Sequence, residues 1–157
     1  MIDVRKFENL TITKISVFDI RFPTSKTLDG SDAIHKDPDY SCAYVILETE
    51  NPDLSGHGFT FTLGRGTEIV VSAVNSICPL VKNRNLVSIL TDFRRFYREL
   101  TNESQLRWLG PEKGVVQLAV AAVLNGIWDL WAKVEEKVVK SARVQTDALT
   151  EQEALSK

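Results

Sequence analysis

The stretch that decides the fold is residues 29–66, which read DGSDAIHKDPDYSCAYVILETENPDLSGHGFTFTLGRG. It begins with a polar loop, residues 29–41, and continues into two apolar runs, residues 42–48 and 57–63. The turn-rich segment 51–56 separates the runs, so they are predicted to pair as a β-hairpin. A polar loop mounted on a hairpin can present hydroxyl and carboxylate groups to a ligand while the sheet holds them still.

A further strand is predicted upstream of the polar loop, over residues 12–22, and Pro23 ends it. Its apolar side chains do not keep one alternation, which predicts a bulge or a change of burial near Val17. Residues 59–63 show the cleanest alternation in the chain, with aromatic or aliphatic residues between threonines. We therefore expect three antiparallel strands.

Helical spacing replaces the strand pattern after the hairpin. The first helix is predicted to start with Thr67 as its N-cap and to be distorted or ended by Pro79. Its expected apolar stripe consists of Val70, Val74, Ile77, Cys78 and Val81. A single second helix is expected to place Arg94, Arg95 and Arg98 toward solvent. Its expected apolar face consists of Leu86, Leu90, Phe93, Tyr97 and Leu100.

A third helix is predicted to begin with Pro111 in its first turn. Residues 115–131 are apolar nearly all round, and such a helix needs neighbours on every side. The two other predicted helices and the small sheet are too few to cover it, so we expect a missing partner. From residue 138 the sequence is polar and short of large apolar side chains, which predicts a tail with a solitary helix from Glu151. The expected division is one domain over residues 11–137 and a polar tail over residues 138–157.

Length and composition fit one soluble globular domain. The chain has 157 residues, of which 43% are hydrophobic and 25% charged, and a net charge of −2. This charge gives no basic field, so we expect no nucleic acid or membrane partner. The charge-free run 114–128 would span about 22 Å as a helix, short of a hydrocarbon core of about 30 Å. We therefore expect a buried helix there.

Cysteine usage and the first residues bear on the compartment. Cys42 and Cys78 form no C-x-x-C pair and no disulfide-dense pattern, which favours a reducing intracellular compartment. The first ten residues, MIDVRKFENL, contain two acids and no apolar core. We therefore expect no secretory signal, and the acids also argue against a mitochondrial transit peptide.

Few residues have the spacing of a catalytic or metal site. The chain has no G-x-S-x-G motif, and neither cysteine has a histidine at a recognisable spacing. His35 with two nearby aspartates is compatible with a hard cation but fits no closed site, and a solvated loop is the simpler interpretation. The Gly64 to Gly66 segment is compatible with an anion, or simply permits a tight strand-to-helix turn. Asp32 and Tyr40 are better candidates, because a carboxylate accepts bonds from sugar hydroxyls and a phenol donates or accepts one.

Six motifs together resemble one family. They are RFPTS (residues 21–25), GSDA (30–33), DPDYS (37–41), FTLGRGTE (61–68), LRWLGPEKGVV (106–116) and AAVLNGIWDLWAK (121–133). In combination they resemble the N-terminal region of the L-fuconate dehydratase family of the enolase superfamily, over roughly residues 11–137. The joint presence of these motifs is highly specific.

The resemblance implies an α+β capping domain, a three-stranded meander followed by about three helices, which in the family closes over a modified TIM barrel. Family members remove the proton α to a sugar-acid carboxylate, stabilise the enediolate with Mg²⁺ and expel a β-hydroxyl as water. The product is a 2-keto-3-deoxy acid. Carried over by motif, the substrate contacts here are Gly30, Ser31, Asp32 and Tyr40. The family barrel supplies the base, the Mg²⁺ ligands and a catalytic histidine.

This chain departs from the family pattern after the third helix. Residues 136–138 replace the Gly-x-Pro turn that leads into the first barrel strand, while residues 146–155 resemble the family segment just beyond that strand. No Lys-x-Lys motif and no spaced Asp/Glu/Glu set follows. We therefore expect a truncated product without a TIM barrel, with no catalytic residues and no bound Mg²⁺ of its own.

The sequence supports three interpretations of function. The leading one is the substrate-capping part of a sugar-acid dehydratase, inactive alone. The alternative is a non-catalytic truncated isoform that associates with full-length subunits through the cap or the helix of Trp128 and Trp131. The third is an unstable chain without function. For the compartment, the family resemblance favours the mitochondrion, and the lack of a clear transit peptide favours the cytoplasm.

Overall fold

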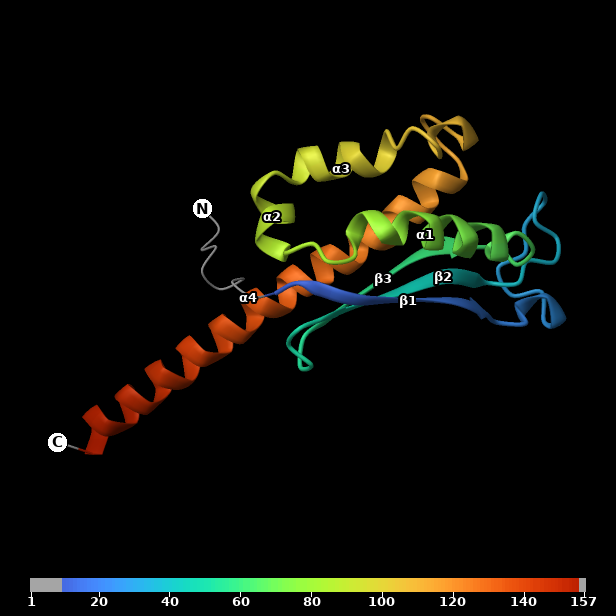
Figure 1. Ribbon diagram of the computed structural model, residues 1–157. Coiled ribbons are helices and arrows are strands. Elements are labelled where there is room, and N and C mark those ends of the chain that lie inside the picture. The colour runs from blue at the N-terminus through green and yellow to red at the C-terminus, as the bar shows by residue number, and fades with distance from the viewer. Residues whose placement is uncertain (1–9, 156–157) are drawn as a thin grey trace.

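The computed structural model describes the backbone of residues 10–155 and the side-chain surroundings of residues 10–135. A three-stranded antiparallel sheet in the order β1-β2-β3 is followed by four α-helices (Figure 1). The elements are β1 (Ile12–Arg21), β2 (Ser41–Thr49), β3 (Ser55–Thr62), α1 (Thr67–Val81), α2 (Leu86–Thr91), α3 (Phe93–Thr101) and α4 (Val115–Leu155). The predicted α+β meander followed by helices is confirmed, and no barrel is present in the described residues.

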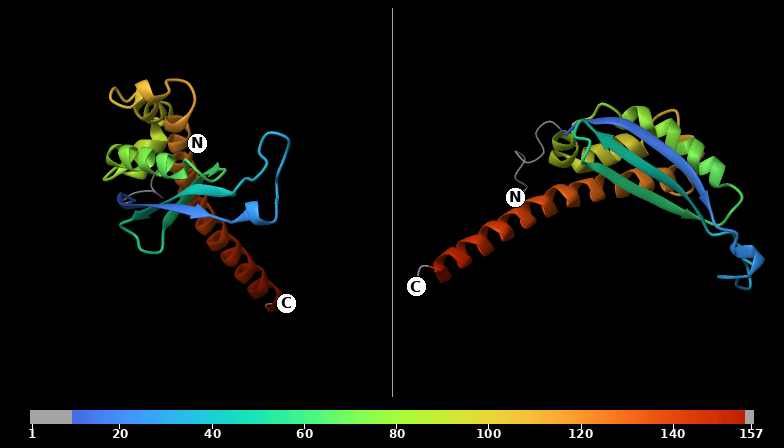
Figure 2. Two further views of the ribbon diagram at one scale, coloured as in Figure 1. Left: turned by 90° about the vertical axis from the view of Figure 1, so that its right-hand side faces the viewer. Right: turned by 90° about the horizontal axis from the view of Figure 1, so that it is seen from below.

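The helices cover one face of the sheet. Helices α1 and α4 pack against the sheet and against each other, whereas α3 packs on α4 and α1 (Figures 1 and 2). The side chains of Ala43, Val45 and Leu47 alternate along β2 toward the helices, and all three are fully buried. The core therefore lies between the central strand and the first and last helices.

Glycines allow β3 and α4 to approach each other at backbone distance. A Cβ atom on Gly58 would lie 2.1 Å from the carbonyl oxygen of Ala122 and 2.3 Å from the amide nitrogen of Gly126. A Cβ atom on Gly56 would lie 2.2 Å from the carbonyl oxygen of Gly126. Only glycine permits this contact, because the atoms that a side chain would meet belong to the helix backbone.

Polar side chains of α4 bind the free edge of β3. The carboxylate of Asp129 accepts a hydrogen bond from the His57 amide at 2.7 Å, and the Asn125 side-chain amide donates to the Phe59 carbonyl at 3.0 Å. The Lys133 ammonium donates to the Ser55 carbonyl at 2.9 Å and pairs with Asp129 at 2.7 Å. These donors and acceptors recur every fourth residue on α4, so one helical stripe satisfies an edge that would otherwise attract another strand.

Of two local predictions near the sheet, one is confirmed and one is wrong. Burial changes near Val17, because Val17 packs against the core whereas Asp19, the next residue on that side of β1, is exposed. The register shift itself lies between Ile12 and Lys14. Thr67 is not the N-cap of α1, because Gly66 holds that position with a φ of 96°. The Thr67 hydroxyl is buried and donates to the Gly64 carbonyl at 2.7 Å. The predicted stripe of α1 is confirmed, and Pro79 lies in its final turn.

The predicted second helix is two helices. The chain breaks at Asp92, with φ −134° and ψ 64°, and the Asp92 carboxylate accepts a hydrogen bond from the Arg95 amide at 3.0 Å. This cap starts a new helix, α3, in which a different set of side chains faces the core. Phe96 and Leu100 are buried on α3, whereas Tyr97, expected on the buried face, is 42% exposed.

The last helix starts later and runs further than predicted. Pro111 precedes α4, which begins at Val115, after Gly114 with a φ of 104°. The α4 backbone is one helix to Leu155, so the prediction of a separate helix from Glu151 is wrong. The domain boundary at residue 137 stays a prediction.

By length and composition alone, Val115–Glu135 qualifies as a candidate membrane span. This is weak evidence, because the core helix of a soluble protein meets the same criterion. Val116, Val123 and Ile127 are buried on α4, while Leu118 and Trp128 are about two-fifths exposed. The sheet and α1 therefore supply much of the cover that its apolar composition requires.

The glycine contact predicts a steric penalty. Replacing Gly58 with alanine should lower the free energy of unfolding by more than about 2 kcal/mol, because the new methyl group meets helix backbone that cannot rotate away. Urea denaturation followed by circular dichroism measures this loss. Asn75→Ala, on the exposed side of α1, is the control and should change stability by less than about 0.5 kcal/mol. Equal stability of the two variants would contradict the contact.

The edge contact predicts a graded loss at Asp129. Asp129→Ala leaves the His57 amide without its acceptor and should cost about 1–3 kcal/mol. Asp129→Asn keeps an acceptor oxygen and should cost less. The same denaturation experiment measures both losses. An Asp129→Ala variant as stable as the unmodified chain, or no more destabilised than Asp129→Asn, would contradict the edge contact.

Candidate functional site

The candidate site is the loop between β1 and β2, which Figure 1 shows at one end of the sheet. Thr24, in the short 3-10 helix η2 (Thr24–Lys26), anchors the loop. Its hydroxyl accepts a hydrogen bond from the Tyr40 amide at 2.9 Å and donates to the Pro38 carbonyl at 2.8 Å. The Asp39 carboxylate accepts from the Ser25 amide at 3.1 Å. Both ends of the loop are thus bound to each other.

Gly30 and Tyr40, two of the predicted substrate contacts, touch. Gly30 has a φ of 73°, and a Cβ atom there would lie 1.8 Å from the Tyr40 phenol oxygen. The Tyr40 ring meets Phe61 of β3 edge to face, with centroids 5.2 Å apart. The sheet therefore fixes the ring of Tyr40, and the absence of a side chain at residue 30 makes room for its hydroxyl group.

Ser31 and Asp32, the other two predicted contacts, are exposed on the same loop. One oxygen of Asp32 accepts hydrogen bonds from the amides of Ile34 and His35 at 2.7 and 2.6 Å, and the other lies 3.1 Å from Nδ1 of His35. Hydrogen bonds from the backbone and side chain of His35 lower the pKa of Asp32 to about 2. The carboxylate is therefore an anion that shapes its own loop.

A hydroxyl cluster below the loop was not recognised from the sequence. The Ser41 hydroxyl accepts a hydrogen bond from the Gly64 amide at 2.7 Å and lies 2.8 Å from the Thr62 hydroxyl and 3.1 Å from the Thr67 hydroxyl. These three small side chains join the start of β2, the end of β3 and the start of α1. Only their spatial proximity identifies them, since their sequence spacing matches no motif.

The structure gives no support to the two alternative ion sites. The Glu68 carboxylate accepts hydrogen bonds from the Gly66 amide at 3.1 Å and from Arg21 at 2.5 Å, so the chain's own acid binds at the predicted anion site. Bonds from its own amide and from Arg21 lower the pKa of Glu68. Within the described residues, no three His, Cys, Asp or Glu side chains gather to hold a metal. We therefore assign no role for magnesium to these residues.

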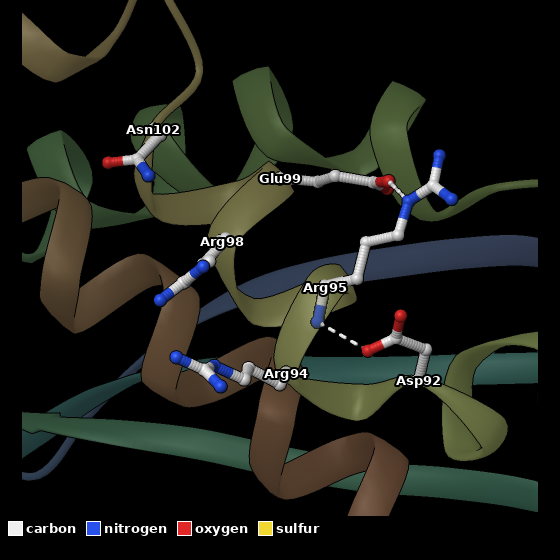
Figure 3. A pocket seen from close by; sticks show the side chains of 6 residues that line it. All are labelled: Asp92, Arg94, Arg95, Arg98, Glu99 and Asn102. Atoms are coloured by element: carbon white, nitrogen blue, oxygen red, sulfur yellow. Dashed lines mark hydrogen bonds and ion pairs between the residues drawn. The ribbon is translucent and has the colours of Figure 1, made fainter.

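A hollow of about 590 Å³ lies on α3, and charged side chains line it (Figure 3). Arg95 and Arg84 donate to the two oxygens of Glu99 at 2.9 and 2.6 Å. Arg94 and Arg98 extend to the other side of the helix from Arg95 (Figure 3). All three α3 arginines are exposed, as predicted, and we interpret this surface as a solvated helix face.

No family model matches the chain. It is 60% identical over 140 residues to mitochondrial enolase superfamily member 1 of Bos taurus, which covers 88% of this chain and 32% of the relative. It is 46% identical over 162 residues to L-galactonate dehydratase of Hypocrea jecorina, covering 94% of this chain and 36% of that one.

The solved structures agree with these relatives. The crystal structure of the human mitochondrial enolase superfamily member 1 matches 80% of this chain and 29% of that one, with a TM-score of 0.78 and 60% identity. The chain is homologous to the enolase superfamily. Its fold matches the N-terminal capping domain of that human structure. It spans about a third of the length of the curated relatives that it matches.

A more distant structure shows the fold alone. L-talarate dehydratase from Polaromonas sp. JS666, solved with magnesium and L-glucarate, is 18% identical, with a TM-score of 0.57, and the match covers 79% of this chain and 29% of that one. The predicted resemblance and fold are confirmed by the homologues and the human structure described above. The roles of Gly30, Ser31, Asp32 and Tyr40 stay predictions, since no comparison tests them.

The loop geometry predicts an unusual titration. The carboxyl group of Asp32 should titrate near pH 2, because its hydrogen bonds favour the ionised form and are lost as the pH falls through that value. The amide proton shifts of Ile34 and His35, followed by NMR between pH 5 and 1.5, report this transition. The transition should disappear in Asp32→Asn, and a midpoint near the ordinary value of 3.8 would contradict the loop structure.

Proposed function

We propose that this chain is the substrate-capping part of a sugar-acid dehydratase of the L-fuconate dehydratase type. The observation that carries the proposal is the anchored β1–β2 loop, whose Gly30–Tyr40 contact and ionised Asp32 occur on a fold shared with mitochondrial enolase superfamily member 1. L-galactonate dehydratase, another relative, carries a sugar acid in its name.

The proposed chemistry of the cap is binding and orientation. The Tyr40 phenol can donate or accept one hydrogen bond with a sugar hydroxyl, and the Asp32 carboxylate can accept one or two. Both groups are exposed on a loop whose ends are bound to each other, so binding a ligand requires less ordering of the loop backbone. Ser31 adds a hydroxyl group to the proposed contact, and Gly30 lets the backbone lie close to the Tyr40 hydroxyl.

The proposal assigns the proton transfer and the metal to other residues. The structural neighbours of this chain include an enzyme solved with magnesium, and a metal would stabilise an enediolate in such a site. The described residues hold no donor set for it, so this chain's part is to recognise the distal hydroxyls and exclude water. We accordingly propose that the chain alone is inactive. The compartment follows the relatives' name, mitochondrial.

A chimera tests this proposal. Residues 11–137 should replace the matching segment of the human relative and leave L-fuconate dehydratase activity in the presence of Mg²⁺. In that chimera, Tyr40→Phe and Asp32→Asn should each lower kcat/KM about 10–100-fold, mainly through KM, because each removes a bond to substrate. Asp32→Asn keeps an acceptor for the loop amides, so it tests the charge rather than loop folding.

The matched control lies in the same loop. Ile34, whose side chain is 84% exposed, makes no predicted substrate contact, so Ile34→Ala should keep kcat/KM within about twofold. A folded chimera without turnover would contradict the capping role. A chimera whose Tyr40 and Asp32 variants match Ile34→Ala would contradict the assigned contacts.

A second candidate function is association with full-length subunits as a non-catalytic isoform. The observation that favours it is the aromatic cluster of Phe93, Trp128 and Trp131, with neighbouring ring centroids 4.5 and 5.6 Å apart. Trp128 is 42% exposed, and the buried indole nitrogen of Trp131 has no hydrogen-bond partner in the described residues. Size-exclusion chromatography with the full-length relative tests this, and separate elution at micromolar concentration would contradict it.

A further inference from the structure

The face of the sheet opposite the helices carries a continuous group of aromatic side chains. Cross-strand neighbours are Phe18, Tyr44 and Phe59 in one row, and Ile20, Cys42 and Phe61 in the next. Phe22 and Tyr40 extend the group toward the loop. We call these eight residues the outer aromatic face.

Much of the outer aromatic face is accessible to solvent in the described structure. Phe59 and Phe61 are each 52% exposed, Phe18 is 47% exposed and Phe22 56%. A shallow hollow of about 390 Å³ lies on it. Since a large aromatic side chain has about 200 Å² to bury, this face presents on the order of 500 Å² of apolar surface. Monomeric soluble proteins rarely leave a contiguous apolar patch of this size exposed without an interaction.

We propose that the outer aromatic face is a self-association surface, on which a second copy of this chain packs sheet against sheet. The area is the first argument: two such faces together bury on the order of 1,000 Å², which is the lower bound for a specific interface. A two-fold axis matches each face with an identical one, and aligned sheets pack about 10 Å apart through interdigitating side chains.

The distribution of polar groups is the second argument. At the far end of the same face, Lys14 and Glu48 form an ion pair at 2.7 Å, and the His57 ring binds the Tyr44 and Ser55 hydroxyls at 2.8 and 2.9 Å. This end already satisfies its polar groups within one copy. Apolar residues thus gather at one end and paired polar groups at the other, as in an interface core with a polar rim.

The interaction does not depend on the proposed capping role. It uses side chains of the strands together with Phe22 and Tyr40 beside them, whereas substrate recognition uses residues 30–32 and Tyr40 of the loop. Tyr40 belongs to both surfaces and Phe61 contacts its ring, so variants of Phe18 and Phe59 separate the two proposals.

The test is the mass of the 157-residue chain in solution. Sedimentation velocity from about 1 to 100 µM should show a shift from 17.6 kDa to twice that mass. The double variant Phe18→Ser, Phe59→Ser should raise the dissociation constant at least about tenfold while keeping the circular dichroism spectrum, because the two side chains are 47% and 52% exposed in one copy. Tyr97→Ser, at an aromatic position on α3 that is 42% exposed, is the control and should leave the dissociation constant unchanged.

A thiol measurement locates the contact independently of folding defects. In a Cys78→Ser background, Cys42 is the remaining cysteine of the chain and lies in the centre of the outer aromatic face. Its alkylation rate should fall several-fold between dilute and concentrated protein. A monomer over the whole range, a polydisperse aggregate, a dimer that the Phe18→Ser, Phe59→Ser variant leaves intact, or a concentration-independent alkylation rate would each overturn the proposal.

Discussion

The close contact of β3 with α4 is the constraint on which the rest of the structure depends. Two glycines of the strand face Ala122 and Gly126 of the helix at backbone distance, and side chains spaced four residues apart on α4 bind the strand's free edge. The contact joins the first half of the chain to the last described helix. Without it, an edge strand and an apolar helix would both be left uncovered, each at a cost in stability or solubility.

This contact also determines what the other face of the sheet looks like. Because side chains alternate along a strand, directing Gly56 and Gly58 at the helix directs Phe59 and Phe61 away from it. Phe61 then supports the Tyr40 ring, which in turn leaves room only for glycine at residue 30. The candidate site is therefore positioned from α4 through β3 to the loop, and the aromatic face results from the same alternation.

The sequence predicts the strands, the α1 stripe and the loop, because each depends on short-range periodicity or turn residues. It does not predict which face of β3 is covered, because the alternation favours burying the aromatic side chains, whereas α4 covers the face of Gly58 and Thr60. It also misses the break at Asp92, because the apolar residues keep a helical spacing from Leu86 to Leu100. The hydrogen bond that caps α3 at Asp92 changes which of these side chains face the core. Asp32 and Tyr40 are proposed from the chemistry of the loop side chains, and Gly30 and Ser31 from the resemblance, but the Ser41 hydroxyl cluster depends on long-range packing that local sequence does not encode.

The measurement that tests the central claim most directly is a dehydratase assay of the purified 157-residue chain. L-fuconate and Mg²⁺ are supplied, and formation of the 2-keto acid is followed over time. The account predicts no turnover, since the described residues offer an anchored recognition loop but no cluster of acids, histidines or cysteines for a metal. Turnover that survives repurification would contradict it, and would require a catalytic site formed by residues outside the loop.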